Sequence, residues 1–123
     1  MLASRLLEIP MAKRPPRPPS PETRALQHLA ELAQRAADPG RVRRAVEAMV
    51  ADWLTDTPPA ERELIHDCVT GLHAALAEGV DAAQAQIEDL DRNDAAGQRQ
   101  AQRSLAALQA ARDALAAARL QLA

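Results

Sequence analysis

Glu63 and His66 have the spacing of a pair of metal ligands on a helix. On a helix, the Glu-x-x-His spacing places a carboxylate and an imidazole on one face, as helical di-metal bundles require. Such a bundle needs a second Glu-x-x-His, and the sequence has none, because His28 and Glu31 occur in the reverse order. His73 is two turns from His66, too far along the axis to chelate the same ion without a third element. The sequence therefore predicts no metal site and no bound cofactor.

Other catalytic or ion-binding patterns are incomplete. The segment 89–93 has the spacing of the start of a calcium loop, but Asp94 stands where that loop needs glycine and Gln100 where it needs a bidentate glutamate. The single cysteine, Cys68, cannot form an internal disulfide and lies on an apolar helical face, which is typical of a small buried hydrophobe. No glycine-rich phosphate loop is present, and no Ser or Cys lies near a plausible base. We therefore expect that the protein is not an enzyme.

A cluster of arginines could contact nucleic acid. It begins an expected helix, directly after Asp38-Pro39-Gly40, so two short helices could form a helix-turn-helix whose basic residues meet phosphates and bases. Positive charge at a helix N-terminus is locally unfavourable, and the acidic body repels DNA, so a solvated cluster is the simpler alternative. With the basic residues of the N-terminal segment, the nucleic-acid candidates are Lys13, Arg14, Arg17, Arg41, Arg43 and Arg44.

The N-terminal segment is rich in proline. Residues 10–21 contain six prolines interleaved with Lys13, Arg14 and Arg17. Because proline fixes φ and removes an N–H donor, we predict that residues 1–19 form a disordered basic arm and residues 20–123 a single helical domain. The arm is either a solubilising tail or a linear motif for an aromatic-lined groove or an acidic partner. Met11 is an alternative to Met1 as the start of the chain.

Three short amphipathic helices are expected after the arm. Ser20, followed by proline, is a good N-cap for the first helix, which should end at residues 38–40, and these residues can also cap the second helix. Thr57 is expected to cap the third helix, and Gly79 to end it. The second helix, 41–55, has an apolar face with helical spacing. That face consists of Val42, Val46, Met49, Val50 and Trp53.

The last third of the chain, 81–123, is expected to be helical, with Asp81 as a plausible N-cap. It contains no proline and is dominated by strong helix formers. A single continuous helix is favoured. A break near Asn93–Gly97 is the alternative, because no apolar residue larger than alanine occurs between Leu90 and Leu105.

A continuous C-terminal helix would be about 60 Å long, whereas the third helix would measure about 30 Å. Its second half would extend beyond that neighbour and leave leucines in water, at a cost of roughly 1.5–3 kcal/mol each relative to burial. We therefore predict that these leucines contact the first two helices, a second copy of the chain or a target protein. If the chain turns near Asn93–Gly97, they belong to its own core instead. The residues are Leu105, Leu108, Leu115 and Leu122.

Composition and charge narrow the class of protein. The chain has 123 residues and a net charge of −2, but residues 1–21 hold four basic residues and one acidic residue. The arm is therefore +3 and the remainder −5. Hydrophobic residues make up 47% of the chain, yet there is one Trp and no Phe or Tyr, which favours thin helix–helix contacts. No signal peptide or membrane-spanning run is recognisable, so we expect a cytoplasmic protein.

Together these patterns predict an all-α bundle of three short helices and a long C-terminal helix. The function we expect is a non-enzymatic interaction protein: an adaptor, assembly factor or small chaperone. It would bind a protein partner or a second copy through the C-terminal helix, the proline-rich arm or both, and no membrane. The alternative is a small DNA-binding regulator that uses the helix of Arg41–Arg44 and the basic arm.

Overall fold

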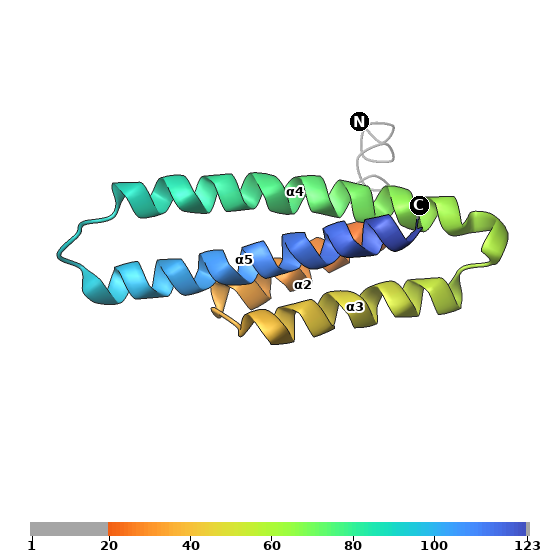
Figure 1. Ribbon diagram of the computed structural model, residues 1–123, viewed down its shortest axis with the longest axis horizontal. Helices are drawn as coiled ribbons and strands as arrows, with labels where there is room; N and C mark the ends of the chain where they lie inside the picture. Colours follow the sequence, from red (N-terminus) through yellow and green to blue (C-terminus); the bar gives the residue numbers. More distant parts are fainter. Residues whose placement is uncertain (1–19, 123) are drawn as a thin grey trace, which may run out of the picture.

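The computed structural model describes residues 20–122, and within them it contains four α-helices and no strand (Figure 1). The predicted all-α bundle is therefore confirmed. The proline-rich arm, residues 1–19, lies outside the described residues. The helices are α2 (Pro21–Gln34), α3 (Pro39–Asp56), α4 (Arg62–Asp89) and α5 (Ala95–Leu122), and a 3₁₀ turn, η1 (Pro59–Glu61), precedes α4.

The first helix begins as predicted, and the second begins at Pro39, two residues before the expected start at residue 41. The hydroxyl of Ser20 accepts a hydrogen bond from the backbone N–H of Thr23 at 3.1 Å. The carboxylate of Asp38 accepts from the N–H groups of Gly40 and Arg41 at 3.0 and 3.3 Å. In both helices a proline follows at the first helical position, where its missing N–H costs nothing.

The turn between α2 and α3 holds an alanine in a left-handed conformation. Ala36 has a φ of 52°, and among the described residues no other non-glycine residue has a positive φ. The N–H of Ala37 donates to the carbonyl of Leu32 at 2.9 Å, and the N–H of Ala36 donates to that of Ala33 at 3.0 Å. This is the hydrogen-bond pattern of a Schellman motif, whose left-handed position favours glycine. The chain therefore stores a small amount of strain at Ala36.

Both predicted ends of the third helix are wrong. Thr57 ends α3, and the N-cap of the following 3₁₀ turn is Pro58, which makes no side-chain capping bond. Gly79 lies inside α4, which continues for ten more residues, to Asp89. Residues 80–89 include three Ala, two Gln and one Glu, which favour helix, and buried Val80 anchors this part of α4.

The C-terminal segment is not one continuous helix. The chain turns between Leu90 and Asp94, so the favoured expectation is wrong and the alternative break is confirmed, a few residues before Gly97. Asp91 Oδ1 accepts from the N–H of Asn93 at 2.9 Å, and Asp94 Oδ1 accepts from the N–H of Gly97 at 2.9 Å. These short polar side chains replace helical hydrogen bonds, which is why the turn forms here. Asp81, the expected N-cap, lies within α4.

The four helices alternate in direction along the chain (Figure 1). Helices α4 and α5 form a long antiparallel hairpin, and the shorter α2 and α3 lie along one end of it. Helix α5 contacts all three other helices, most extensively α4 and then α3. Helix α3 runs in the same direction as α5, so these two helices pack in parallel.

The core lies where all four helices overlap. Each helix contributes a fully buried side chain: Leu29 from α2, Val46 from α3, Leu72 from α4 and Leu115 from α5. Beyond this overlap, no side chain between Val80 and Leu105 is buried. Helices α4 and α5 have 28 residues each and are about 42 Å long, whereas the 18 residues of α3 span about 27 Å. The hairpin therefore projects from the bundle at its α4–α5 turn.

Candidate partner-binding surface

The four leucines predicted to bind a partner lie against the bundle. Leu115 is completely buried and Leu105 is 8% exposed, whereas Leu108 and Leu122 are partly buried and pack against the core. The expectation that they extend beyond a neighbouring helix is wrong, because the turn at Leu90–Asp94 brings α5 back along α4. Only Leu108 and Leu122 keep surface that a partner could reach. A role for the leucines in binding stays a prediction.

Instead, a groove of about 530 Å³ lies between α3 and the C-terminal half of α5. Its floor includes the buried side chains of Val46, Val50 and Ala114. Because most of the other apolar side chains are alanines, which extend only one carbon from the backbone, the space between the two helices stays open. These further apolar lining residues are Ala51, Leu54, Ala110, Ala117 and Ala118.

The rim of the groove is polar. Arg43 Nε lies 3.9 Å from Glu47 Oε1 on the α3 side, and both side chains are mostly exposed. On the α5 side, Asp113 lines the groove, and its Oδ1 lies 3.1 Å from Arg112 Nε. Exposed pairs of this kind contribute about 0–1 kcal/mol to stability. An apolar floor inside a charged rim is the usual anatomy of a protein–protein interface.

The sequence analysis did not predict this groove, because it assigned partner binding to the leucines of the C-terminal segment. The signal was present as a second stripe, the alanines at 110, 114, 117 and 118, which have helical spacing. On α3, Ala51 and Leu54 widen the predicted apolar face on one side. The parallel packing of α3 on α5, which brings the two stripes together, is a long-range feature that local patterns do not contain.

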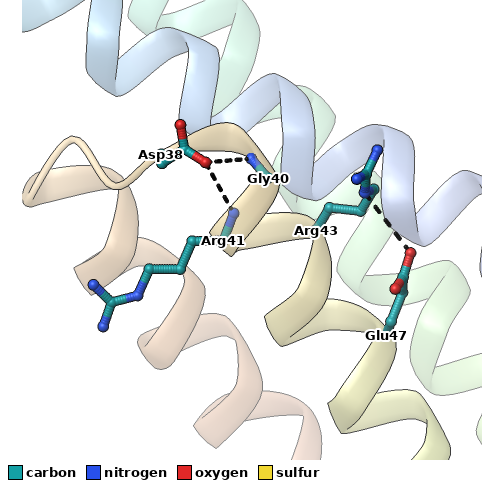
Figure 2. A network of polar contacts seen from close by, with 5 residues as sticks. All are labelled: Asp38, Gly40, Arg41, Arg43 and Glu47. Carbon is teal, nitrogen blue, oxygen red and sulfur yellow. Dashed lines mark hydrogen bonds and ion pairs between the residues drawn. The ribbon is translucent and has the colours of Figure 1, made fainter.

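The arginine cluster at the start of α3 does not converge on one point. Arg41, Arg43 and Arg44 are all exposed, and Figure 2 shows the side chains of Arg41 and Arg43 on different sides of the helix. The carboxylate of Asp38 already accepts hydrogen bonds from two N–H groups of the first turn, and Glu47 lies beside Arg43 (Figure 2). A phosphate at this helix end would compete with Asp38. Lys13, Arg14 and Arg17 lie outside the described residues, and DNA binding stays a prediction.

A second groove, of about 320 Å³, lies where the start of α2, the end of α3 and the start of α4 meet. It is lined by Trp53 and Cys68, which are partly buried, and by Leu64, whose surface is 64% exposed. Burial raises the pKa of the Cys68 thiol, and the nearby carboxylate of Glu22 raises it further. The thiol is therefore protonated at neutral pH, where it is a poor nucleophile.

The pair that suggested a metal site lies at the surface of α4. Glu63 is exposed, and Nδ1 of the half-buried His66 lies 4.0 Å from a carboxylate oxygen of Asp67. Over residues 20–122, His, Cys, Asp and Glu side chains do not gather in groups of three or more that could hold a metal ion. None of the helices in the same range combines the length and the hydrophobicity needed to cross a membrane. No family model matches the chain, and no curated protein or solved structure does.

Proposed function

We propose that this protein is a non-enzymatic interaction protein that binds an amphipathic helix of a partner protein in the groove between α3 and α5. The single observation that carries the proposal is the groove itself: an apolar floor with alanine walls inside a rim of charged side chains. Docking of a helix through its apolar face is a common mode of peptide recognition. An adaptor, an assembly factor or a small chaperone would each use such a surface.

The dimensions of the groove suit a helix. Its lining follows α3 from Pro39 to Leu54, a helical distance of roughly 22 Å, and a partner helix of about four turns has the same length. Ala51 and Ala117 are exposed residues of the lining, so both are accessible to a partner. Alanine also allows a partner helix to approach closely.

The rim indicates the chemistry of the partner. Glu47 on α3 and Asp113 on α5 place a carboxylate on each side of the groove, whereas Arg43 is the one basic side chain of the lining. A helix with a narrow apolar stripe and basic residues on both sides of it would complement this arrangement. We place the complex in the cytoplasm as part of this proposal, because a single cysteine offers no internal disulfide that would indicate an oxidising compartment.

Affinity purification from the native host, with three forms of the full chain, tests the proposal. The double variant Ala51→Glu/Ala117→Glu adds charge at two exposed positions of the groove. Ala48→Glu is a control for added charge on α3, because Ala48 is also exposed but does not line the groove. Circular dichroism of all three forms checks that the helices are intact.

We expect at least one protein to copurify with the wild type and with Ala48→Glu, and to be lost with the double variant. Its binding segment, made as a peptide, should be helical in the complex. If the double variant retains every partner of the wild type, the groove is not the binding surface. If sedimentation shows that the wild type self-associates and that only the double variant is monomeric, the occupant of the groove is a second copy of the chain.

A further inference from the structure

The second groove, beside Trp53, has a chemistry that one segment of this chain matches. We infer that the proline-rich segment 10–19 docks into this groove of its own chain, with its prolines against Trp53 and Leu64 and its basic residues beside Glu22 and Glu61. The inference does not depend on the groove between α3 and α5. It assigns a function to a surface that the proposed partner helix does not use.

The groove combines apolar and acidic groups. Trp53 and Leu64 provide an aromatic ring and an exposed aliphatic side chain, and Leu64 is one of three large hydrophobic residues left exposed in the described part of the chain. The charged residues of the lining, Glu22 and Glu61, are both acidic. Proline-rich peptides in an extended helix bind to aromatic-lined surfaces of this kind, and acidic residues at the edge select basic neighbours of the prolines.

Segment 10–19 has the complementary composition. It contains five prolines, three basic residues and no acidic residue, and its sequence is PMAKRPPRPP. Because proline restricts the unbound chain, less conformational entropy is lost when such a segment binds. The segment is therefore suited in both charge and conformation to a groove that contains tryptophan and glutamate.

The segment is joined to the domain beside the groove. Ser20 itself lines the groove, so the segment is joined to the domain at the edge of its docking site. The backbone of Ser20 has φ −61° and ψ 157°, close to the polyproline conformation, so the described chain begins in the geometry that the bound segment needs. A short tether gives the segment an effective concentration in the millimolar range. Even a weak site, with a dissociation constant of about 0.1 mM, would then be occupied about 90% of the time.

The groove contains two natural probes for a test on the full chain. Trp53 is the only tryptophan and Cys68 the only cysteine of the sequence, and both line the groove. Acrylamide quenching of the fluorescence of Trp53 and the rate of alkylation of Cys68 by iodoacetamide both report its occupancy. The test variant is Arg14→Glu/Arg17→Glu, and Arg5→Glu is the control, because it reverses one charge outside segment 10–19.

Arg14→Glu/Arg17→Glu should increase the quenching of Trp53 and raise the alkylation rate of Cys68 by up to about tenfold, the ratio expected when a site that is 90% occupied becomes free. Arg5→Glu should leave both quantities at the wild-type value. Adding Glu22→Arg and Glu61→Arg to the test variant should restore the protection of Trp53 from quenching, because the charges are then exchanged across the contact.

Two results would overturn the inference. One is that Arg14→Glu/Arg17→Glu behaves as the wild type in both measurements while the helical content is unchanged. The other is that protection of Trp53 in the wild type falls on dilution, because the groove would then hold the segment of a second copy. A comparison of protein concentrations over two orders of magnitude separates the second result from intramolecular docking.

Discussion

The carboxylate of Glu22 in α2 lies against the backbone of Gly71 in α4. A methyl group added at Gly71 would lie 2.5 Å from Glu22 Oε1, so glycine leaves space here for a side chain of the adjacent helix. Glu22 is exposed in the first turn of α2, so its carboxylate can rotate towards solvent. At Gly79, farther along α4, the same methyl group would have only Leu108 Cδ2 nearby, at the ordinary contact distance of 3.9 Å.

These two glycines give the first prediction. Gly79→Ala should raise the free energy of unfolding by about 0.5–1 kcal/mol, because alanine favours helix and has space at this position. Gly71→Ala should raise the free energy of unfolding by less, since the added methyl group must displace the carboxylate of Glu22. In a Glu22→Ala background the two gains should become equal, as urea denaturation of the single and double variants can show. Equal gains in the wild-type background would contradict the contact between Glu22 and Gly71.

The leucines of α5 give the second prediction. Leu115→Ala should lower the free energy of unfolding by about 2–5 kcal/mol, because it leaves a cavity in the core. Leu120→Ala is the control on the same helix, and it should change stability by less than about 0.5 kcal/mol, since Leu120 is 79% exposed. The double variant Leu108→Glu/Leu115→Glu should unfold at room temperature. A folded double variant in circular dichroism would show that α5 does not pack as described.

The left-handed alanine gives the third prediction. Ala36→Gly should stabilise the protein by about 1 kcal/mol, because glycine adopts a positive φ without the steric cost that alanine has at 52°. The matched control is Ala30→Gly, at an exposed position inside α2, which should destabilise by about 0.5–1 kcal/mol. Thermal melts of the two variants should therefore shift in opposite directions. Destabilisation by both would mean that residue 36 is helical in solution.

The thiol of Cys68 gives the fourth prediction, a dependence on pH. Its pKa is raised first by burial and second by the carboxylate of Glu22. Glu22→Gln removes the second cause and lowers the pKa, so the curve of alkylation rate against pH should move to lower pH and the rate at pH 8 should increase. Glu31→Gln, in the same helix, should leave the curve in place. A shift of the curve to higher pH would mean that the electrostatic argument has the wrong sign.

The fifth prediction tests the DNA alternative. If Arg41, Arg43 and Arg44 contact phosphates, the logarithm of the binding constant for duplex DNA should fall linearly with the logarithm of the salt concentration. Replacing all three by alanine should then make that slope shallower by about 3. A variant with three exposed arginines of the hairpin replaced, Arg92, Arg99 and Arg103, should retain the wild-type slope. If the wild type does not bind duplex DNA even at low salt, the DNA alternative is excluded.

Local signals in the sequence predicted the parts of the fold that local interactions decide. Ser20 and Asp38 cap their helices through their own side chains, and the valines of α3 follow a single helical face, so both features could be inferred without tertiary information. The prediction that Gly79 ends the third helix was wrong, although glycine often ends a helix. In α4 it is followed directly by buried Val80, and the packing of α4 against α5 outweighs the local preference for a helix end.

The candidate surfaces were harder to predict, because each depends on residues that are distant in the sequence. The groove between α3 and α5 exists only because these helices pack in parallel, and the sequence does not show which pairs of helices are neighbours. The groove beside Trp53 joins the start of α2 to the end of α3 and the start of α4. The turn near Asp94 lay within reach of sequence reasoning, since Asp91, Asn93 and Asp94 are typical turn residues. High helix propensity on both sides favoured a continuous helix, so the break was only the alternative.

The projecting end of the α4–α5 hairpin has a consequence for how the molecule opens. Between Val80 and Leu105 no side chain is buried, so this end can separate and close again while the core around Leu72 and Leu115 stays intact. Its amide protons should therefore exchange with solvent at a lower free-energy cost than those of the core. The turn at Leu90–Asp94 is also a natural place to insert a fluorescent protein or an epitope, because a break in the chain there interrupts no buried contact.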